Sequence, residues 1–401
     1  MRRSLLLPLA AALSLSACAE QSPTAPASFA PSRTARDASS IWSSTITGET
    51  GPGSQYALYM PAAWNGDVVF YAHGIRPAFA PVELPTGDGF PDVRDALGAR
   101  GYAVAYSSFS ENGWAVKDGA QRTHQLSGLF TSKFGAPKRS YLAGTSLGGL
   151  VVQQMAETFP GKYDGVLAMC APLAGTKTEI DWVANVRVLF DLFYPGVVPG
   201  NVLSVPGNID FDTQVQPKVI AAVMANPTGL GIIARVAQTP LAGSSPTELI
   251  TSLIYALKYD FIGIDDFLGR THGHSMFDNS GTTYTAVIPG LLPDSVLAFI
   301  NYKVARFTST PDAEQYLAKY YQPTGALSVP TVTLHSVNDP LVPWRLHEPA
   351  FAARVDSTGT SSQLLQKTVA GFGHCTFSTS QMMDGFDALA QWVTTGIKPA
   401  S

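Results

Sequence analysis

The feature that most constrains the fold is an alternation of short apolar runs with longer amphipathic segments. Five runs in the first half of the chain have the composition of strands: residues 55–61, 66–74, 101–109, 139–146 and 163–172. The third and fourth flank residues 113–130, a segment long enough for a helix. Strands that alternate with helices predict a mostly parallel sheet with helices on both faces, the doubly wound α/β class.

The alternation is interrupted once. Helical patterns and Pro/Gly-rich joints fill residues 176–327, and strand patterns return only at 329–343 and 364–377. We therefore expect an α/β core of residues 41–175 and 328–398. We expect residues 176–327 to form a mainly helical cap or lid over the carboxyl ends of the strands, because ligands bind at that edge of open α/β sheets.

Composition narrows the possible partners. A chain of 401 residues with 45% apolar and 14% charged residues can bury a large core. A net charge of -4 gives no basic surface for nucleic acid, so we expect no nucleic-acid partner. The composition favours a substrate that is recognised by shape and apolar contact; it indicates no oligomeric state.

The N-terminal segment predicts export. Two arginines precede an apolar run over residues 5–15, which is too short for a membrane span and typical of a signal peptide. The tetrapeptide 15–18, Leu-Ser-Ala-Cys, resembles the lipobox of bacterial lipoproteins, in which Cys18 is lipidated after cleavage and anchors the protein to the membrane. The alternative is an ordinary cleaved signal, with a periplasmic or secreted product. Residues 19–40, rich in Ala, Ser and Pro, are expected to form a disordered tether.

A Gly-x-Ser-x-Gly motif marks a candidate nucleophile. Ser146 lies directly between a predicted strand and the helix predicted over 147–159, with Gly144 and Gly148 on either side. Glycines remove side chains where a sharp strand-to-helix turn is crowded, and such a turn presents its serine to a substrate. The alternative is a tight structural turn without chemistry.

A serine nucleophile needs a histidine that a carboxylate holds in place. Asp339 follows the apolar strand run 331–338 and precedes Pro340, and His374 follows the next strand in a glycine-flanked loop. The alternative acids are Glu348 and Asp356, which fall well past the end of the strand.

In the order Ser, Asp, His, these motifs resemble the α/β-hydrolase fold family over the expected core. The resemblance implies that Ser146 is the nucleophile, His374 the general base and then acid, and Asp339 the group that orients the imidazole. It also implies an oxyanion hole formed by the backbone N–H of Leu147 and that of Gly74 or Ile75. No cofactor is expected.

Several other histidines and aromatic residues are candidates for binding roles. We expect His73, Asn112 and Trp114 to contact substrate, although Trp114 is equally compatible with packing in a structured loop. The pair His272 and His274 lacks helical spacing or a cysteine partner, so no metal is expected. The remaining expectations are a core position for His335 and helix-surface positions for His124 and His347.

The cysteines allow one disulfide. In the implied fold, Cys170 and Cys375 lie at the same edge of the sheet, and a looser resemblance to secreted bacterial hydrolases adds Cys-x-Pro and Gly-His-Cys motifs at these positions. A Cys170–Cys375 bond would pin the histidine loop. Two unrelated cysteines remain the alternative, because spacing alone does not establish pairing.

Three functions remain open at this point. The first is a secreted serine hydrolase that cleaves carboxylic esters, small or polymeric, with hydrophobic or aromatic acyl groups. The second is a peptidase or aminopeptidase, for which Asp260, Asp265 and Asp266 are candidate ligands of a substrate amine. The third is a catalytically silent binding lipoprotein on the same scaffold.

Overall fold

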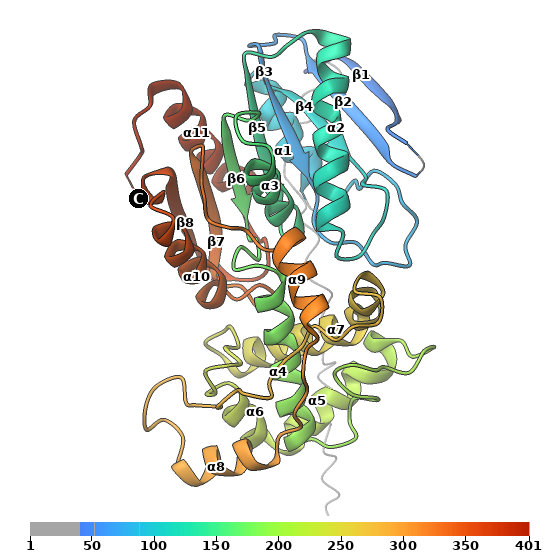
Figure 1. The fold of residues 1–401 in the computed structure, drawn as a ribbon, viewed down its shortest axis with the longest axis vertical. Coiled ribbons are helices and arrows are strands. Elements are labelled where there is room, and N and C mark those ends of the chain that lie inside the picture. Colours follow the sequence, from blue (N-terminus) through green and yellow to red (C-terminus); the bar gives the residue numbers. More distant parts are fainter. Residues whose placement is uncertain (1–40, 52, 88, 401) are drawn as a thin grey trace, which may run out of the picture. The chain divides into compact units, whose positions relative to one another are not determined.

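An eight-stranded sheet forms the centre of the described part of the chain (Figure 1). The computed structural model describes residues 41–51, 53–87 and 89–400, so the expected signal peptide, Cys18 and the tether lie outside the described residues. The strand order is β1-β2-β4-β3-β5-β6-β7-β8. Only the pairings β1–β2 and β2–β4 are antiparallel. The strands are β1 Trp42–Glu49, β2 Gln55–Pro61, β3 Asp67–Ala72, β4 Ala103–Ser107, β5 Arg139–Thr145, β6 Gly165–Met169, β7 Thr331–Asn338 and β8 Leu364–Phe372.

Helices cover both faces of this sheet, which confirms the predicted α/β class. One face packs against α2, α3 and α10 through a large apolar cluster, and the other packs against α1 and α11 through a second cluster. The central strands β3, β4 and β6 are buried at every position, as expected for strands between two helical layers. The covering helices are α1 Phe90–Ala99, α2 Val116–Phe134, α3 Leu147–Thr158, α10 Trp344–Ser357 and α11 Thr379–Thr395.

Between β6 and β7 the chain leaves the sheet. Residues 176–327, all of them described, contribute helices and no strand of the sheet. Figure 1 shows these helices at the end of the sheet toward which the β6 arrow points. The helices are α4 Thr176–Phe193, α5 Gln216–Ala225, α6 Pro227–Ile233, α7 Pro246–Arg270, α8 Asp294–Lys303 and α9 Pro311–Tyr320, with a π-helical turn at Phe211–Val215 before α5.

A buried ion pair joins the two longest helices of this insertion. Arg187 of α4 is fully buried, and its guanidinium lies 3.3 Å from the carboxylate of Asp260 on α7. Asp191, one turn along α4, also accepts from Arg187. Asp260 therefore lies in the interior of the insertion, where Arg187 balances its charge. It is not part of a solvated helix face.

The insertion contacts loops that follow the strands β4 and β7. Asp266 of α7 accepts the backbone N–H of Trp114 at 2.7 Å, and Ser252 of α7 donates to the carbonyl of Pro340 at 3.3 Å. Trp114 and Pro340 lie just beyond the carboxyl ends of their strands. The insertion thus rests on the edge of the sheet where the candidate residues are found.

Close backbone contact between β3 and α3 fixes the turn at Ser146. A Cβ on Gly148 would overlap the carbonyl oxygen of Ala72, and a Cβ on Gly144 would overlap the carbonyl of Gly148. The start of α3 can therefore lie against the end of β3 because residue 148 is glycine, and against the end of β5 because residue 144 is glycine. This contact brings the Gly74–Ile75 turn next to the first residues of α3.

We predict that Gly148→Ala destabilises the protein by about 3 kcal/mol or more, because rigid backbone atoms leave the new methyl group no space. Gly128→Ala is the matched control: Gly128 lies within α2, and a Cβ there meets nothing within 4 Å. The control should be neutral or stabilising by up to about 1 kcal/mol. Urea denaturation followed by circular dichroism measures both changes, and equal stabilities for the two variants would contradict the prediction.

Candidate active site

Ser146 occupies a strained turn between β5 and α3. Its backbone angles, φ 54° and ψ −126°, lie in a region that L-residues rarely adopt. The Ser146 N–H donates to the carbonyl of Met169 at 2.8 Å, which ties the turn to the end of β6. The backbone geometry thereby holds the Ser146 side chain at the carboxyl edge of the sheet, whichever rotamer the side chain adopts.

The three residues selected from the sequence lie in one chain of hydrogen bonds. His374, in the loop after β8, has its Nε2 2.8 Å from the Ser146 hydroxyl oxygen and its Nδ1 2.8 Å from Oδ2 of Asp339. Both distances allow strong hydrogen bonds. With Nδ1 protonated toward the carboxylate, Nε2 faces the serine as a proton acceptor.

Asp339 is fully buried and accepts several hydrogen bonds. Its Oδ1 accepts the backbone N–H groups of Leu341 and Val342, each at 2.9 Å, in the turn that leads into α10. Burial by itself would raise the pKa of this carboxyl, but the hydrogen bonds and charges of His374 and His335 outweigh it and hold the pKa well below its ordinary value. Asp339 is therefore a carboxylate at neutral pH.

The alternative acids lie elsewhere. Asp356 is exposed on α10. Glu348 is buried beneath Asp339, where its Oε2 accepts from Thr333 at 2.7 Å and its Oε1 lies 3.1 Å from Nδ1 of His335. Neither of these carboxyl groups has a hydrogen bond to His374.

The backbone N–H groups expected to bind an oxyanion gather near Ser146. Leu147 is the first residue of α3, so its N–H has no acceptor within the helix. The contact of Gly148 with Ala72 and His73 brings the turn after β3 to the same place. Leu147 and the Gly74–Ile75 turn are thus neighbours, and the N-terminal end of α3 adds a partial positive charge.

A disulfide between Cys170 and Cys375 adjoins the histidine. The two Cα atoms are 5.4 Å apart, and the bond links residues 205 positions apart in the sequence. The Cys375 sulfur also lies 3.5 Å from Nε2 of His374. Among the described residues, these three side chains form one group with metal-ligand spacing, but both sulfur atoms are consumed by the disulfide and leave no thiolate for a metal.

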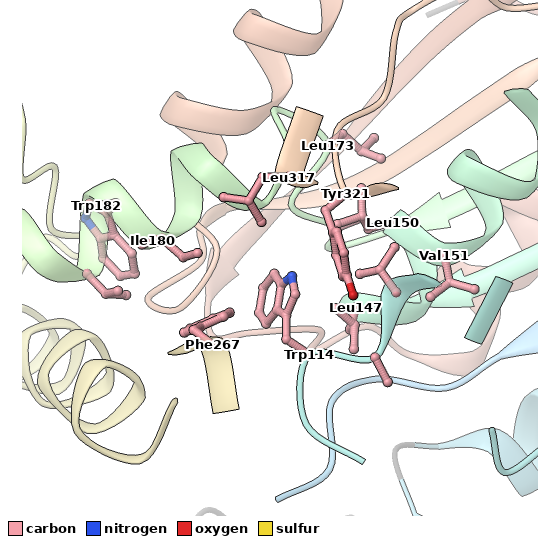
Figure 2. Close-up of a cluster of buried hydrophobic side chains, with 14 of the residues drawn as sticks. Trp114, Leu147, Leu150, Val151, Leu173, Ile180, Trp182, Phe267, Leu317 and Tyr321 are labelled. Atoms are coloured by element: carbon pink, nitrogen blue, oxygen red, sulfur yellow. The ribbon is translucent and has the colours of Figure 1, made fainter. Parts of the chain in front are cut away.

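A mainly apolar cavity opens to the surface, and its wall includes Ile75 of the expected oxyanion turn but none of Ser146, Asp339 and His374. The cavity is lined by the core turn at Ile75 and by residues of the insertion, among them Ile180, Val183 and Phe267. Figure 2 shows Trp114 among these apolar side chains, between Phe267 and Leu147. The indole N–H of Trp114 donates to Thr176 at 2.7 Å, which fixes the ring in this position.

The other residues expected at the substrate lie outside the cavity wall. His73 is buried, stacked on Phe109 with ring centroids 3.9 Å apart, and its Nδ1 lies 2.6 Å from the Gly74 carbonyl. Asn112 donates to the carbonyls of Ala80 and Pro81. Both side chains brace loops around the cavity, whereas Trp114 lines it.

The expectation that His347 lies on a helix surface is wrong, because α10 packs against the sheet and buries this residue. Its Nδ1 accepts the N–H of Ala174, so the other nitrogen, Nε2, carries the proton and donates to Glu179 at 2.7 Å. Burial lowers the pKa of His347 to about 3, which keeps the ring neutral. His124, which was also expected on a helix surface, is half-buried and stacks on Phe159.

Glu179 is a polar group that the sequence analysis missed. It is 4% exposed, lies in the first turn of α4 and lines the cavity. Burial, followed by the negative charge of Asp339, raises its pKa well above the ordinary value. A Glu within an amphipathic helix pattern gives no sign in the sequence that it will be buried.

Several solved structures are similar to this chain at low sequence identity. No family model and no curated protein sequence matches the chain. An esterase from Aspergillus oryzae has a TM-score of 0.49 at 14% identity, over 88% of this chain and 80% of its own. Feruloyl esterase B from the same organism has 0.47 at 14%, over the same shares. The rice cell wall degrading esterase LipA from Xanthomonas oryzae has 0.38 at 15%, over 85% of this chain and 84% of its own. At such identities no substrate is carried over, and the fold assignment rests on the sheet and on the turn at Ser146.

We predict that reduction of the Cys170–Cys375 bond lowers both the melting temperature and the activity. A closed loop of this length stabilises the folded chain by roughly 3–5 kcal/mol in the chain-entropy model, and the bond also restrains the loop that carries His374. Calorimetry with and without reductant measures the loss. The double variant Cys170→Ala/Cys375→Ala is the control and should not respond to reductant; a wild-type melting temperature that is equally indifferent would contradict the prediction.

Proposed function

We propose that this chain, which has the α/β-hydrolase fold, is a serine hydrolase that cleaves carboxylic esters through an acyl-enzyme. The observation that carries the proposal is the hydrogen-bonded series Ser146, His374, Asp339, with both His374 distances at 2.8 Å. A serine in a strained turn, an imidazole on its hydroxyl and a buried carboxylate behind the imidazole are the parts that acyl transfer requires.

The chemistry follows from this arrangement. Nε2 of His374 takes the hydroxyl proton as Ser146 Oγ attacks the ester carbonyl, and the carbonyl oxygen becomes an oxyanion held by the N–H groups of Leu147 and of Gly74 or Ile75. The same imidazole then gives its proton to the departing alcohol. A water molecule, activated by His374, hydrolyses the acyl-enzyme and restores the serine. Asp339 keeps the imidazole in the required tautomer and stabilises its charged form.

The cavity supports an apolar or aromatic substrate group. Its wall is mainly aliphatic and aromatic, which suits an apolar group of a substrate. We propose that residues 176–327 act as a cap, because α4 and α7 supply most of the wall while Trp114 and Ile75 come from the core. Small and polymeric esters with such a group are both compatible with an opening to the surface.

A peptidase function is the second candidate, and the carboxylates proposed for it are otherwise engaged. Asp260 is paired with Arg187, and Asp266 with Arg270 and the Trp114 N–H. Asp265 is exposed and does not line the cavity. A substrate amine would thus meet carboxylates that already have partners, which favours the ester. A silent binding protein would have no need of the strained serine turn.

We propose further that the protein is exported and tethered to a membrane through a lipid on Cys18. The support is the lipobox-like tetrapeptide, together with a disulfide that persists in oxidising compartments. Among the described residues, no helix is both long and apolar enough to cross a bilayer. Labelling with a radioactive fatty acid, compared between wild type and Cys18→Ala, tests the anchor.

We predict that Ser146→Ala and His374→Ala each reduce kcat by about 10³-fold or more with little change in stability, since the members of a triad act together. Asp339→Asn should be severe as well, because it favours the wrong tautomer of His374. The assay is hydrolysis of a short acyl aryl ester beside an aminoacyl arylamide. Ser132→Ala, on the exposed surface of α2, is the control and should retain full activity. Equal activity of Ser146→Ala and wild type, or failure of a fluorophosphonate to label Ser146, would refute the proposal.

We predict that Trp114→Ala changes substrate preference more than turnover, because the indole forms a wall of the cavity and makes no hydrogen bond to Ser146, His374 or Asp339. Across a series of aryl esters with lengthening acyl chains, the optimum should move to a longer chain, with KM for the shortest ester raised several-fold. An unchanged profile would place the substrate outside this cavity.

A further inference from the structure

A second histidine lies behind the proposed triad. His335 is on β7, four residues before Asp339, and is fully buried. Its Nε2 is 2.9 Å from the carbonyl oxygen of Val342 and 3.4 Å from Oδ2 of Asp339. Its Nδ1 is 3.1 Å from Oε1 of Glu348 on α10. The ring therefore stands between the triad carboxylate and a second buried carboxylate.

Both ring nitrogens of His335 face oxygen atoms that accept protons. A backbone carbonyl cannot donate, so Nε2 must carry a hydrogen toward Val342. On the opposite side, a proton must lie between Nδ1 and Glu348, since a bare nitrogen facing a bare carboxylate would be repulsive. The remaining question is whether that proton belongs to the ring or to Glu348.

The surroundings of Glu348 favour the ring. Oε2 of Glu348 accepts hydrogen bonds from the Thr333 hydroxyl and the Gln366 amide, so this oxygen is occupied by donors. A carboxylate that accepts from two side chains and from an imidazolium has its lone pairs well used. His335 with two protons also satisfies every acceptor around it at once.

Charge balance gives the same answer. The titratable groups that face this cluster are Asp339, Glu348, His374, Glu179 and His347. His347 is neutral and Glu179 has a raised pKa, so neither offsets the charges of Asp339 and Glu348. Burial disfavours a charged His335, but hydrogen bonds to Asp339 and Glu348 and their charges outweigh burial and raise its pKa to about 10. Without that proton, two buried carboxylates, Asp339 and Glu348, would both lie against a neutral ring.

We propose that His335 is a doubly protonated positioning residue that compensates the buried charge of Asp339 and fixes this carboxylate toward His374. The role in catalysis rests on the serine hydrolase function proposed above, whereas the protonation state does not. In this arrangement Glu348 holds the imidazolium, the imidazolium holds Asp339, and Asp339 holds His374. Glu348, His335 and Asp339 thus form a series of alternating charges that extends from the triad into the core.

A positive charge behind Asp339 has a consequence for pH dependence. The imidazolium of His335 is a positive charge next to Asp339, and it opposes the development of a second positive charge at the active site. His335→Gln removes the charge and retains an amide that can donate to Val342. The acidic limb of the kcat/KM profile should then move to higher pH.

The first test measures the proton directly and needs no substrate. In protein labelled with ¹⁵N-histidine, long-range ¹H–¹⁵N spectra at about pH 8.5 should contain one ring with both nitrogens protonated, whereas a histidine of ordinary pKa is neutral there. This signal should be missing from His335→Gln. If that variant does not fold, Glu348→Gln provides the assignment, because it changes the acceptor of Nδ1–H and shifts the same signal. Spectra in which every ring has one bare nitrogen would overturn the proposal.

The second test separates positioning from mere structural support. In His335→Gln the acidic limb should move upward by about one pH unit, the order expected for charges several ångströms apart in a partly buried site. The activity below the limb would then fall about tenfold relative to wild type. His124→Gln, which alters a histidine on α2 that contacts Tyr163 and Phe159, is the control and should leave the profile unchanged. A lower plateau with an unmoved limb would overturn the positioning role. A protein inactive on every ester would instead refute the proposed function, and the spectra would still decide the protonation of His335.

Discussion

The contact between two backbone segments, the end of β3 and the start of α3, determines where the functional groups of this protein lie. Gly144 and Gly148 have no side chains, so the backbone at these positions packs directly against neighbouring carbonyl groups. A Cβ at either position would overlap such a carbonyl group. The strain of Ser146 is a result of this approach, and it is stabilised by the packing of α3 across the sheet. The same approach sets the turn after β3 beside the N-terminal end of α3. One steric requirement thus positions a hydroxyl group and the backbone donors around it together.

A second requirement is electrostatic. Asp339 is buried as a carboxylate, which is costly unless donors surround it. Those donors come from three directions: backbone N–H groups of the turn before α10, His374 from the loop after β8, and His335 from the interior of β7. The acid therefore depends on the packing of β7 against β8 and α10 as much as on its own position. A change in any of these elements alters the electrostatic environment of the His374 imidazole.

The sequence contained enough to predict the core and the candidate site, for identifiable reasons. Strands that are buried on both faces give continuous apolar runs, and glycines around Ser146 mark a turn that few other residues permit. β1 was not predicted, because this edge strand is mostly exposed and its residues lack an apolar alternation. The position of His347 was misjudged since its burial depends on where α10 packs, which is a property of the assembled sheet. The burial of Glu179 and Arg187 arises in the same way, from contacts between segments distant in the chain.

The spacing of the disulfide has a consequence for the order in which the molecule can be completed. Cys170 directly follows β6, and its partner is synthesised 205 residues later, after the whole insertion, β7 and β8. During synthesis, the Cys170 thiol therefore has no native partner until all of these segments have been made. In the folded protein, the pairing of β8 with β7 brings Cys375 to the sheet edge at Cys170. The bond therefore joins the histidine loop to the end of β6 across the whole insertion, and this link persists in an oxidising compartment.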